Sequence, residues 1–320
     1  MGSKPLVRPP RLRRGSRIAL VAPAGPLLER DDITRAVLLC RALDYEAVPG
    51  PHVAGHYGYF SGTDEERLAD LNGAFRDPSI DAVWCIRGGY GVTRILDGID
   101  FEALARHPRP VIGYSDITAL LAGVGRRAGM VAFHAPTARA EMPLFSRLHF
   151  AQVLTGSGPA GALQPLPVPP DILVPQENRV VTIRGGIAEG PLAGGNLSLL
   201  QCLVGTPWFP DLDGALLFLE DVNEDLYRID RMLSHLRLAG ALAELRGVLV
   251  GRFTNLKRHM NDGALGLDEV LFHQLGTLGV PVAYGLPIGH IDAQWTLPIG
   301  VRARFDADTG GVDLLEPAVA

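Results

Sequence analysis

Cysteine is scarce in this chain, and its three cysteines lie far apart. Cys40, Cys85 and Cys202 are odd in number, and no two of them form a C-x-x-C pair. Such a set is typical of reduced core residues in a cytoplasmic protein, and it argues against a disulfide framework or a cysteine-based zinc site. We therefore expect a cytoplasmic protein with no bound metal.

Long apolar runs and an excess of basic charge are missing too. No run reaches the ~18 apolar residues of a membrane helix, and the formal net charge of −5 favours no nucleic-acid partner. Five arginines in residues 8–17 precede an apolar segment, as they would in a signal peptide. That segment is short and ends at Pro23, so we interpret it as the first buried strand.

The first half alternates strand and helix patterns. Residues 31–43 have helical spacing, and Thr63 with Glu66 makes a capping box that opens a second helix. The predicted buried strands are residues 17–22, 81–86, 109–113 and 130–133. Strands separated by helices predict a parallel α/β sheet with right-handed crossovers.

The composition changes after residue 155, and this change sets the predicted domains. Residues 1–155 form the α/β domain, residues 156–175 are a Gly- and Pro-rich linker, and residues 176–320 form a smaller β-rich α/β domain. In the second half the predicted helices are residues 196–203 and 224–238. The predicted strands there are residues 180–183, 215–219, 246–250, 281–283, 301–305 and 311–314.

Ser115 lies where an apolar strand changes into an amphipathic helix. Residues 113–116, Gly-Tyr-Ser-Asp, form the junction. A hydroxyl at such a turn is exposed at a strand end, and nearby backbone N–H groups can hold an oxyanion. The alternative is an ordinary helix-capping serine, which is common, and the motif lacks the final glycine of the usual hydrolase elbow.

A serine nucleophile needs a base and a group that orients the base. Glu220 ends the strand predicted at 215–219, although the acids near it also suit a helix N-terminus. His290 ends a Gly- and Pro-punctuated loop and is the best base among nine histidines, with His134 as the second choice. We predict that Ser115, Glu220 and His290 act together.

Residues 87–91, Arg-Gly-Gly-Tyr-Gly, follow another predicted strand. Adjacent glycines let the backbone approach a ligand closely, and the spacing does not match the dinucleotide fingerprint G-x-G-x-x-G. An N–H from Gly88 or Gly89, with that of Asp116, would make a two-donor oxyanion hole. We expect no organic cofactor.

In their order and local contexts these residues resemble the serine LD-carboxypeptidases, also called murein tetrapeptide carboxypeptidases. The resemblance covers nearly the whole chain. It is carried by residues 20–25 (Leu-Val-Ala-Pro-Ala-Gly), 87–91, 113–116, 133–136 (Phe-His-Ala-Pro), 194–198 (Gly-Gly-Asn-Leu-Ser), Glu220 with 227–233, and 285–290 (Gly-Leu-Pro-Ile-Gly-His). Each motif alone is weak, and the seven in order are specific.

The resemblance implies a flavodoxin-like N-terminal domain that carries the nucleophile, a β-rich C-terminal domain that carries Glu220 and His290, and a cytoplasmic homodimer. The implied substrate is murein tetrapeptide, from which the terminal D-alanine is released across an L,D-peptide bond. The family also includes microcin-C immunity peptidases, which act on an acyl-sulfamoyl adenylate conjugate. The segment between Ser115 and Glu220 is short for that group, which favours the murein enzyme.

An exopeptidase must also recognise the terminal carboxylate of its substrate. A guanidinium is the natural partner, so Arg87 and Arg228 are candidates beside Tyr90, and structural ion pairs are the alternative for both arginines. A non-catalytic peptide-binding protein of two α/β domains is the remaining hypothesis. It needs no reactive serine, so covalent labelling of Ser115 separates the two.

Overall fold

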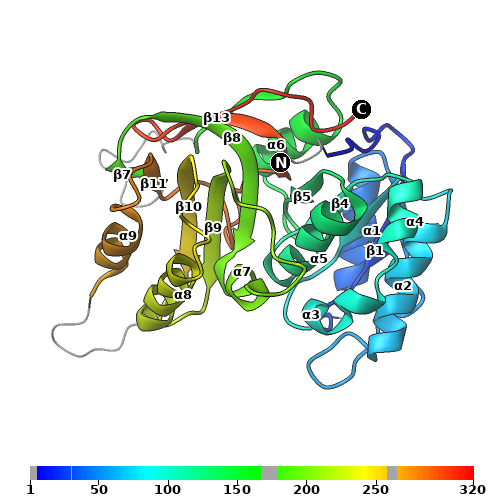
Figure 1. Cartoon of the computed structure of the whole chain (residues 1–320). Coiled ribbons are helices and arrows are strands. Elements are labelled where there is room, and N and C mark those ends of the chain that lie inside the picture. The colour runs from blue at the N-terminus through cyan, green and yellow to red at the C-terminus, as the bar shows by residue number, and fades with distance from the viewer. Residues whose placement is uncertain (1–5, 30, 167–178, 258–264) are drawn as a thin grey trace.

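The computed structural model describes residues 6–29, 31–166, 179–257 and 265–320, and it contains two β-sheets (Figure 1). In the first sheet five strands are parallel, and one strand from the far end of the chain is added antiparallel. In spatial order the strands are β12 (Leu297–Ile299), β5 (Ala132–His134), β4 (Val111–Gly113), β3 (Ala82–Cys85), β1 (Arg17–Val21) and β2 (Glu46–Pro49). The order β2-β1-β3-β4-β5 is that of flavodoxin, which confirms the predicted fold class.

Helices cover both faces of this sheet. On one face, apolar residues of α1 (Asp32–Ala42) and α6 (Leu144–Leu154) pack with strand residues such as Trp84. On the other face lie α2 (Asp64–Arg76), α3 (Val92–Ile95), α4 (Phe101–Arg106) and α5 (Thr118–Gly123). The capping box is confirmed, because the Thr63 hydroxyl accepts from the Glu66 N–H at 3.2 Å and Glu66 accepts from the Thr63 N–H at 2.8 Å.

The second sheet is mixed. Its spatial order is β6 (Gly161–Leu163), β14 (Gly311–Leu314), β13 (Arg302–Asp306), β8 (Ile187–Asn196), β9 (Leu216–Val222), β10 (Gly247–Thr254), β11 (Val282–Tyr284) and β7 (Val181–Arg184). The central strands β8 to β11 are parallel. Three helices pack on one face of these strands, namely α7 (Leu197–Leu203), α8 (Leu226–Leu238) and α9 (Leu267–Leu275).

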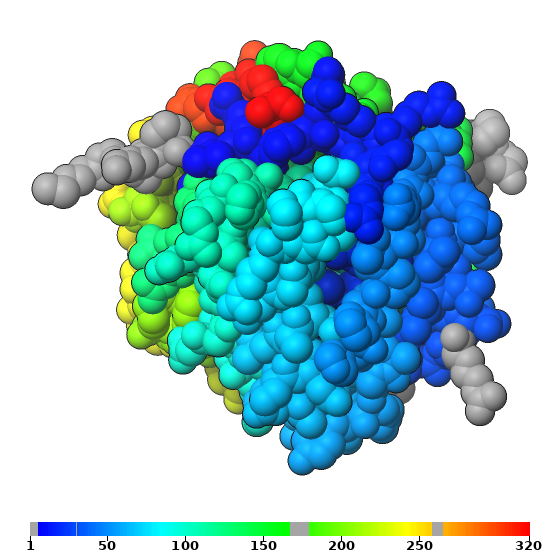
Figure 2. Space-filling view, turned by 90° about the vertical axis from the view of Figure 1, so that its right-hand side faces the viewer, coloured from blue at the N-terminus to red at the C-terminus, as the bar shows by residue number. Residues whose placement is uncertain are grey.

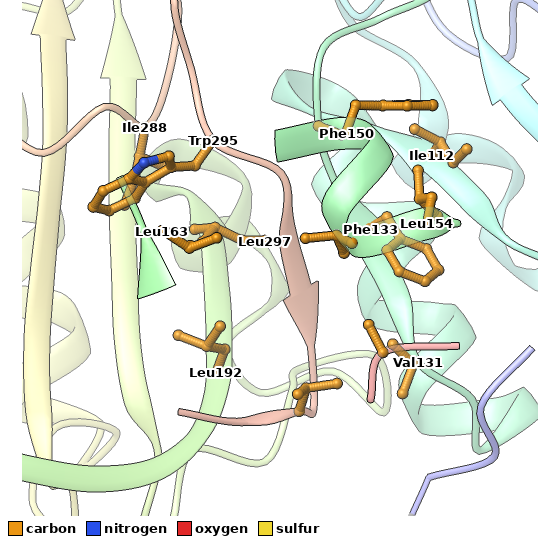
Figure 3. Packing of buried hydrophobic residues seen from close by; sticks show 14 of the residues in the cluster. Ile112, Val131, Phe133, Phe150, Leu154, Leu163, Leu192, Ile288, Trp295 and Leu297 are labelled. Atoms are coloured by element: carbon orange, nitrogen blue, oxygen red, sulfur yellow. The ribbon is translucent and has the colours of Figure 1, made fainter. Parts of the chain in front are cut away.

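The other face of the central strands joins the core of the first half. One continuous cluster of buried residues contains Trp84 and Phe133 from the first sheet together with Phe218 and Phe305 from the second. Figure 3 shows Leu297 of β12 between Trp295 and Leu163 on one side and Phe133 and Leu154 on the other. The two halves therefore share a core, and burial of this apolar surface holds them together.

Three segments differ from the expected boundaries. Gly161–Leu163, inside the predicted linker at 156–175, is strand β6 of the second sheet, and residues 167–175 of that linker lie outside the described residues. Leu297–Ile299, inside the predicted second domain, completes the first sheet instead. The ten-residue strand β8 was not expected, because its glycines and its proline are poor strand formers.

A segment near the start of the described residues pairs with Ala320. The Arg11 N–H donates to the Ala320 carbonyl at 3.1 Å, and the Ala320 N–H donates to the Pro9 carbonyl at 2.9 Å. Figure 2 shows the N-terminal segment in dark blue lying beside the C-terminal residues in red. Over the described ranges, every helix is too short or too polar to cross a bilayer.

Candidate active site

Ser115 occupies a strained turn between β4 and α5. It begins a 3₁₀ turn, Ser115–Ile117, and its φ of 66° is in the left-handed region. This conformation is unfavourable for a residue with a Cβ, by roughly 1–2 kcal/mol. The turn presents the hydroxyl beyond the carboxyl end of β4, as the elbow of a serine hydrolase does. The N-cap of this turn is Tyr114, which makes no side-chain capping hydrogen bond, and the Ser115 hydroxyl is directed to His290 instead.

The structure brings Ser115, His290 and Glu220 together in one hydrogen-bonded chain. His290 Nδ1 lies 2.7 Å from Glu220 Oε2, and His290 Nε2 lies 3.1 Å from Ser115 Oγ. The Glu220 carboxylate can only accept, so the imidazole proton is on Nδ1 and Nε2 accepts from the serine hydroxyl. These residues come from both halves of the chain, and the order Ser-Glu-His differs from that of chymotrypsin-like triads.

Glu220 is completely buried within β9, which continues two residues beyond it to Val222 rather than ending at the predicted residue 219. Burial raises the pKa of this carboxyl, and the hydrogen bond and charge of His290 oppose that rise. Its second oxygen, Oε1, accepts from the Asn196 amide at 3.2 Å. The same amide group donates to Asp221 Oδ1 at 3.0 Å, so Asn196 fixes two buried acids at once.

Asn196 contacts the candidate triad, although the sequence alone assigned it no role. It ends β8, and its side-chain oxygen caps α7 by accepting from the Leu199 N–H at 3.3 Å. Its own N–H donates to the Thr118 hydroxyl at 3.0 Å, in the helix that follows Ser115. Asn196 therefore links the acid of the second half to the nucleophile turn of the first.

Glycine is required next to His290. Gly289 has a φ of 120°, and a Cβ there would lie 2.9 Å from Glu220 Cβ. The loop is held on the end of β10, where the Arg252 N–H donates to the Ile288 carbonyl at 2.8 Å. Because glycine has no Cβ, the backbone at residue 289 can lie against Glu220, and this places the neighbouring His290 imidazole within reach of the Glu220 carboxylate.

Gly88 lies directly against Ser115. A Cβ at this position would stand 2.7 Å from Ser115 Cβ and 3.4 Å from the Asp116 nitrogen. The backbone of residues 88 and 89 therefore borders the same small space as the Asp116 N–H, which is the arrangement that the predicted oxyanion hole requires. Gly89 has a φ of 117°, which favours glycine there as well.

Asp116 ties the loop at 88–91 to the nucleophile turn. It is buried, and its Oδ2 accepts from the Val92 N–H at 2.9 Å, at the start of α3. Its other oxygen has no hydrogen-bond partner among the described residues. Burial raises the pKa of Asp116 to about 6, against the lowering effects of Val92 and Arg67.

His134 has a different environment from the one that a base needs. It is completely buried at the end of β5, and within the described ranges neither ring nitrogen has a hydrogen-bond partner. Burial, with a smaller effect from His290, lowers the pKa of His134 to about 3. Its ring packs on Phe218 and Tyr114, so it supports the site as a neutral side chain.

Tyr114 is a second residue that the sequence analysis left without a role. Its ring centroid lies 4.8 Å from that of His290. Burial raises the pKa of Tyr114 to about 12, so the phenol remains neutral at physiological pH. The contact restricts the imidazole to the orientation in which it meets Ser115.

The three candidate substrate-binding residues occupy different surroundings. Arg87 is part-buried and donates to the Pro26 carbonyl. Tyr90 is half-exposed, and its ring lies 5.8 Å from Tyr59 in an aromatic cluster at the rim of the 88–91 loop. Arg228 lies on α8, where it pairs with the two acids at positions 224 and 225. These ion pairs do not join it to the triad.

Metal-binding groups are not clustered in the part of the chain that the structure describes. No set of three or more His, Cys, Asp or Glu side chains there is arranged to hold a metal ion. Glu220 and Asp221 are adjacent, but their oxygens are engaged by His290, Asn196 and Ser198. The arrangement is suited to nucleophilic and general acid–base chemistry.

Family models match both halves of the chain. Residues 18–135 match the LD-carboxypeptidase N-terminal domain, and residues 189–305 match the LD-carboxypeptidase C-terminal domain. The chain belongs to the LD-carboxypeptidase family. The family resemblance inferred from the motifs is thereby confirmed, and membership places the protein in a family of peptide hydrolases.

Relatives in this family include two functional groups. The murein tetrapeptide carboxypeptidase of Pseudomonas aeruginosa is 36% identical over 91% of this chain and 94% of its own. The structure of the muramoyltetrapeptide carboxypeptidase of Oxalobacter formigenes has a TM-score of 0.78 and 30% identity, covering 93% and 97% of the two chains. The microcin C7 self-immunity protein, in its complex with aspartyl sulfamoyl adenosine, has a TM-score of 0.88 and 25% identity over 98% and 100%.

Proposed function

We propose that this protein is a serine LD-carboxypeptidase that releases the terminal D-alanine of murein tetrapeptide, in the recycling of cell-wall peptides. The observation that carries the proposal is the hydrogen-bonded chain from Ser115 through His290 to Glu220. The 36% identity to a murein tetrapeptide carboxypeptidase supports the choice of substrate. No metal or organic cofactor takes part in the proposed reaction.

In the proposed mechanism Ser115 Oγ attacks the carbonyl carbon on the L-side of the terminal D-alanine. His290 Nε2 takes the hydroxyl proton as the new C–O bond forms, and it then gives that proton to the leaving amine. Water, deprotonated by the same nitrogen, hydrolyses the acyl-enzyme and regenerates the serine. Glu220 holds the imidazole in the tautomer that accepts from serine and balances its charge when it is protonated.

The oxyanion formed in each step is held by backbone N–H groups. The proposed donors are Asp116 and one of Gly88 and Gly89, supported by the contact of Gly88 with Ser115. A donor of this kind is worth about 3 kcal/mol in the transition state. Because these donors belong to the backbone, side-chain substitutions cannot remove them directly.

The test of the proposed function is D-alanine release from murein tetrapeptide, measured by mass spectrometry. We expect release by the wild type in the presence of EDTA, and loss of at least roughly 10³-fold in kcat for Ser115→Ala. Covalent labelling by a serine-reactive probe should be lost in the same variant. Near-normal turnover of Ser115→Ala would overturn the mechanism, and no release by folded wild type would overturn the substrate.

A second candidate function is hydrolysis of an aminoacyl or peptidyl adenylate conjugate. It is supported by the TM-score of 0.88 to the microcin C7 self-immunity protein in complex with aspartyl sulfamoyl adenosine. Stacking on the base of such a conjugate calls for an exposed aromatic side chain. The three tryptophans, Trp84, Trp208 and Trp295, are buried, whereas Tyr59 and Tyr90 at the rim of the 88–91 loop are exposed, so aromatic exposure does not separate the two functions. Parallel assays with both substrates separate the two functions.

The homodimer and the cytoplasmic location implied by the family are part of the proposal. Sedimentation equilibrium of the purified protein tests the first, and fractionation of cells that express the native gene tests the second. The proposed partner is a small peptide, with no nucleic acid and no membrane involved.

A further inference from the structure

A buried carboxylate, Asp32, holds one arginine, and a second arginine reaches the same segment of the chain, residues 25–29. Asp32, at the start of α1, is completely buried and accepts from the Leu28 N–H at 3.0 Å and the Glu29 N–H at 3.2 Å. Arg139, in the segment after β5, donates to both of its oxygens at 3.3 and 3.4 Å. The carboxylate is thus an anchor that holds the Arg139 guanidinium in place, while 30% of that side chain stays exposed.

Arg87 brings the second guanidinium to the same region. It donates to the Pro26 carbonyl, and its Cζ lies 3.8 Å from the point where a Cβ on Gly25 would be. The Gly25 N–H donates to the Gly88 carbonyl at 3.1 Å. Gly88 in turn borders Ser115. The backbone of Gly25 and Gly88 therefore lies between the Arg87 guanidinium and the Ser115 side chain.

The charges in this cluster do not balance. Among the described residues Asp32 pairs with Arg139, whereas the hydrogen bond of Arg87 goes to an uncharged carbonyl, which leaves the Arg87 charge without a carboxylate partner there. Burial, then the charge of Arg139, lowers the pKa of Arg87, while Asp32 has the opposite effect. The field of Arg139 also reaches Tyr114, whose ring contacts His290. A bound anion would relieve the repulsion between the guanidinium groups.

We propose that Arg87 and Arg139 form a carboxylate-binding subsite, positioned by Asp32, that takes the terminal carboxylate of the peptide substrate. The proposal rests on the proposed carboxypeptidase function and names the residues that make it an exopeptidase. In a terminal residue the carboxylate lies only ~4 Å from the scissile carbonyl, one peptide repeat. A guanidinium fork binds a carboxylate in two parallel hydrogen bonds, which fixes the last residue of the substrate as well as its charge.

Arg228, the other arginine predicted to bind the carboxylate, has a different charge balance. It pairs with Glu224 at 3.8 Å and with Asp225 at 3.6 Å, two acids that directly precede its own helix. Its charge is therefore compensated locally by two acids. Asp32 pairs with Arg139 and leaves Arg87 without such a partner among the described residues, and this difference assigns the substrate carboxylate to Arg87 and Arg139.

The test compares two substrates, murein tetrapeptide with a free terminal carboxylate and the same peptide with a terminal carboxamide. We expect the wild type to prefer the acid, and Arg87→Gln and Arg139→Gln to raise KM for the acid roughly 10- to 100-fold. The amide should be hydrolysed equally by wild type and variants. Arg35→Gln is the matched control, because Arg35 is an exposed arginine of α1 that pairs with Glu29.

Binding is measured as well as turnover, so that the subsite can be tested without the reaction. In the Ser115→Ala background, calorimetry should show tighter binding of the acid than of the amide, and Arg139→Gln should abolish that difference. Arg139→Lys keeps a positive charge beside Asp32 but lacks the two-pronged guanidinium group, so we expect it to give an intermediate effect. This variant replaces Arg139→Gln if the glutamine variant fails to fold. Equal losses for acid and amide, or no loss for either, would overturn the subsite. Failure of the wild type to hydrolyse either peptide would overturn the proposed function instead.

Discussion

At the scale of single residues, several residues of the site have backbone conformations or buried polar groups that lower the stability of the folded protein. Ser115 has a left-handed backbone, and Glu220 and Asp116 are carboxyls buried in the protein. Each state lowers stability unless neighbours compensate it, and such compromises are typical of functional sites. The compensation is visible for Glu220, which is engaged by His290 and Asn196.

Glu220→Gln tests the role of the buried acid. The amide preserves shape but cannot balance an imidazolium or fix the tautomer, so we expect kcat to fall on the order of 10³- to 10⁴-fold. The midpoint of thermal unfolding should not fall, because a buried charge is removed. The measurements are D-alanine release and calorimetry, with Glu102→Gln, a 92% exposed acid of α4, as the control. Retained kcat would contradict the proposed role.

Asp116 gives a pH dependence of stability. Its pKa is raised from 3.8 to about 6, so the folded state binds more protons than the unfolded state between these values. Stability is therefore greatest below pH 3.8 for this group and falls as pH rises through about 6, by an amount on the order of 3 kcal/mol.

Asp116→Asn should remove that decline, because the amide does not titrate and its oxygen can still accept from the Val92 N–H. The measurement is the free energy of urea unfolding at a series of pH values, for the variant and the wild type. Asp97→Asn, at an exposed position, is the control. Parallel curves for wild type and Asp116→Asn would show that the buried carboxyl does not titrate in this range.

The candidate triad could be predicted from sequence because each member has a local signal. Ser115, Glu220 and His290 each follow an apolar strand or a glycine loop, which marks a strand end. The roles of Asn196 and Arg139 depend on contacts with Glu220 and Asp32, residues distant in the chain. Such roles have no local pattern, so they emerge only when the fold brings the partners together.

At the scale of elements, the contact of β8 with α5 positions the nucleophile. Gly195 of β8 has a φ of 143°, and a Cβ there would lie 2.6 Å from the Thr118 side chain. Gly194 would likewise meet the Phe218 carbonyl of β9. These glycines are the reason why β8 was not predicted from the sequence, because glycine is a poor strand former. In the structure the same glycines allow β9 and α5 to pack closely against β8.

Gly195→Ala should push α5 away from β8 and disturb Ser115. We expect a loss of stability of at least about 1–3 kcal/mol from overpacking, with a fall in kcat. Gly205→Ala is the matched control, because it has a φ of 79° and no atom within 4 Å of the added Cβ. Unfolding midpoints and kcat are compared, and equal effects of the two substitutions would rule out the packing explanation.

At the scale of the whole molecule, each half of the chain completes the other. β12, from near the C-terminus, pairs with β5 at the edge of the first sheet, and residues 9 and 11 pair with Ala320. The flavodoxin-like order could be predicted from the alternation of strands and helices in the first half. The contribution of β12 could not, because a three-residue strand far along the chain carries no signal of its partner.

Fragments 1–158 and 159–320 test this interdependence. Fragment 1–158 lacks β12 and exposes the core around Phe133, so we expect it alone to bind a hydrophobic dye and to melt without cooperativity. Co-expressed fragments should associate and recover D-alanine release. The measurements are dye fluorescence, calorimetry and activity. A sharp melting transition for fragment 1–158 alone would show that it is an independent folding unit.

The burial of all three tryptophans has an optical consequence. Trp84 stacks on Phe150, Trp208 lies beneath Arg127, and Trp295 donates to the Gln164 carbonyl. None of these indoles is exposed at the triad, so their emission should be blue-shifted and should not respond to a peptide there. Intrinsic fluorescence therefore monitors the packing of both halves in one signal, and occupancy of the site requires an extrinsic label.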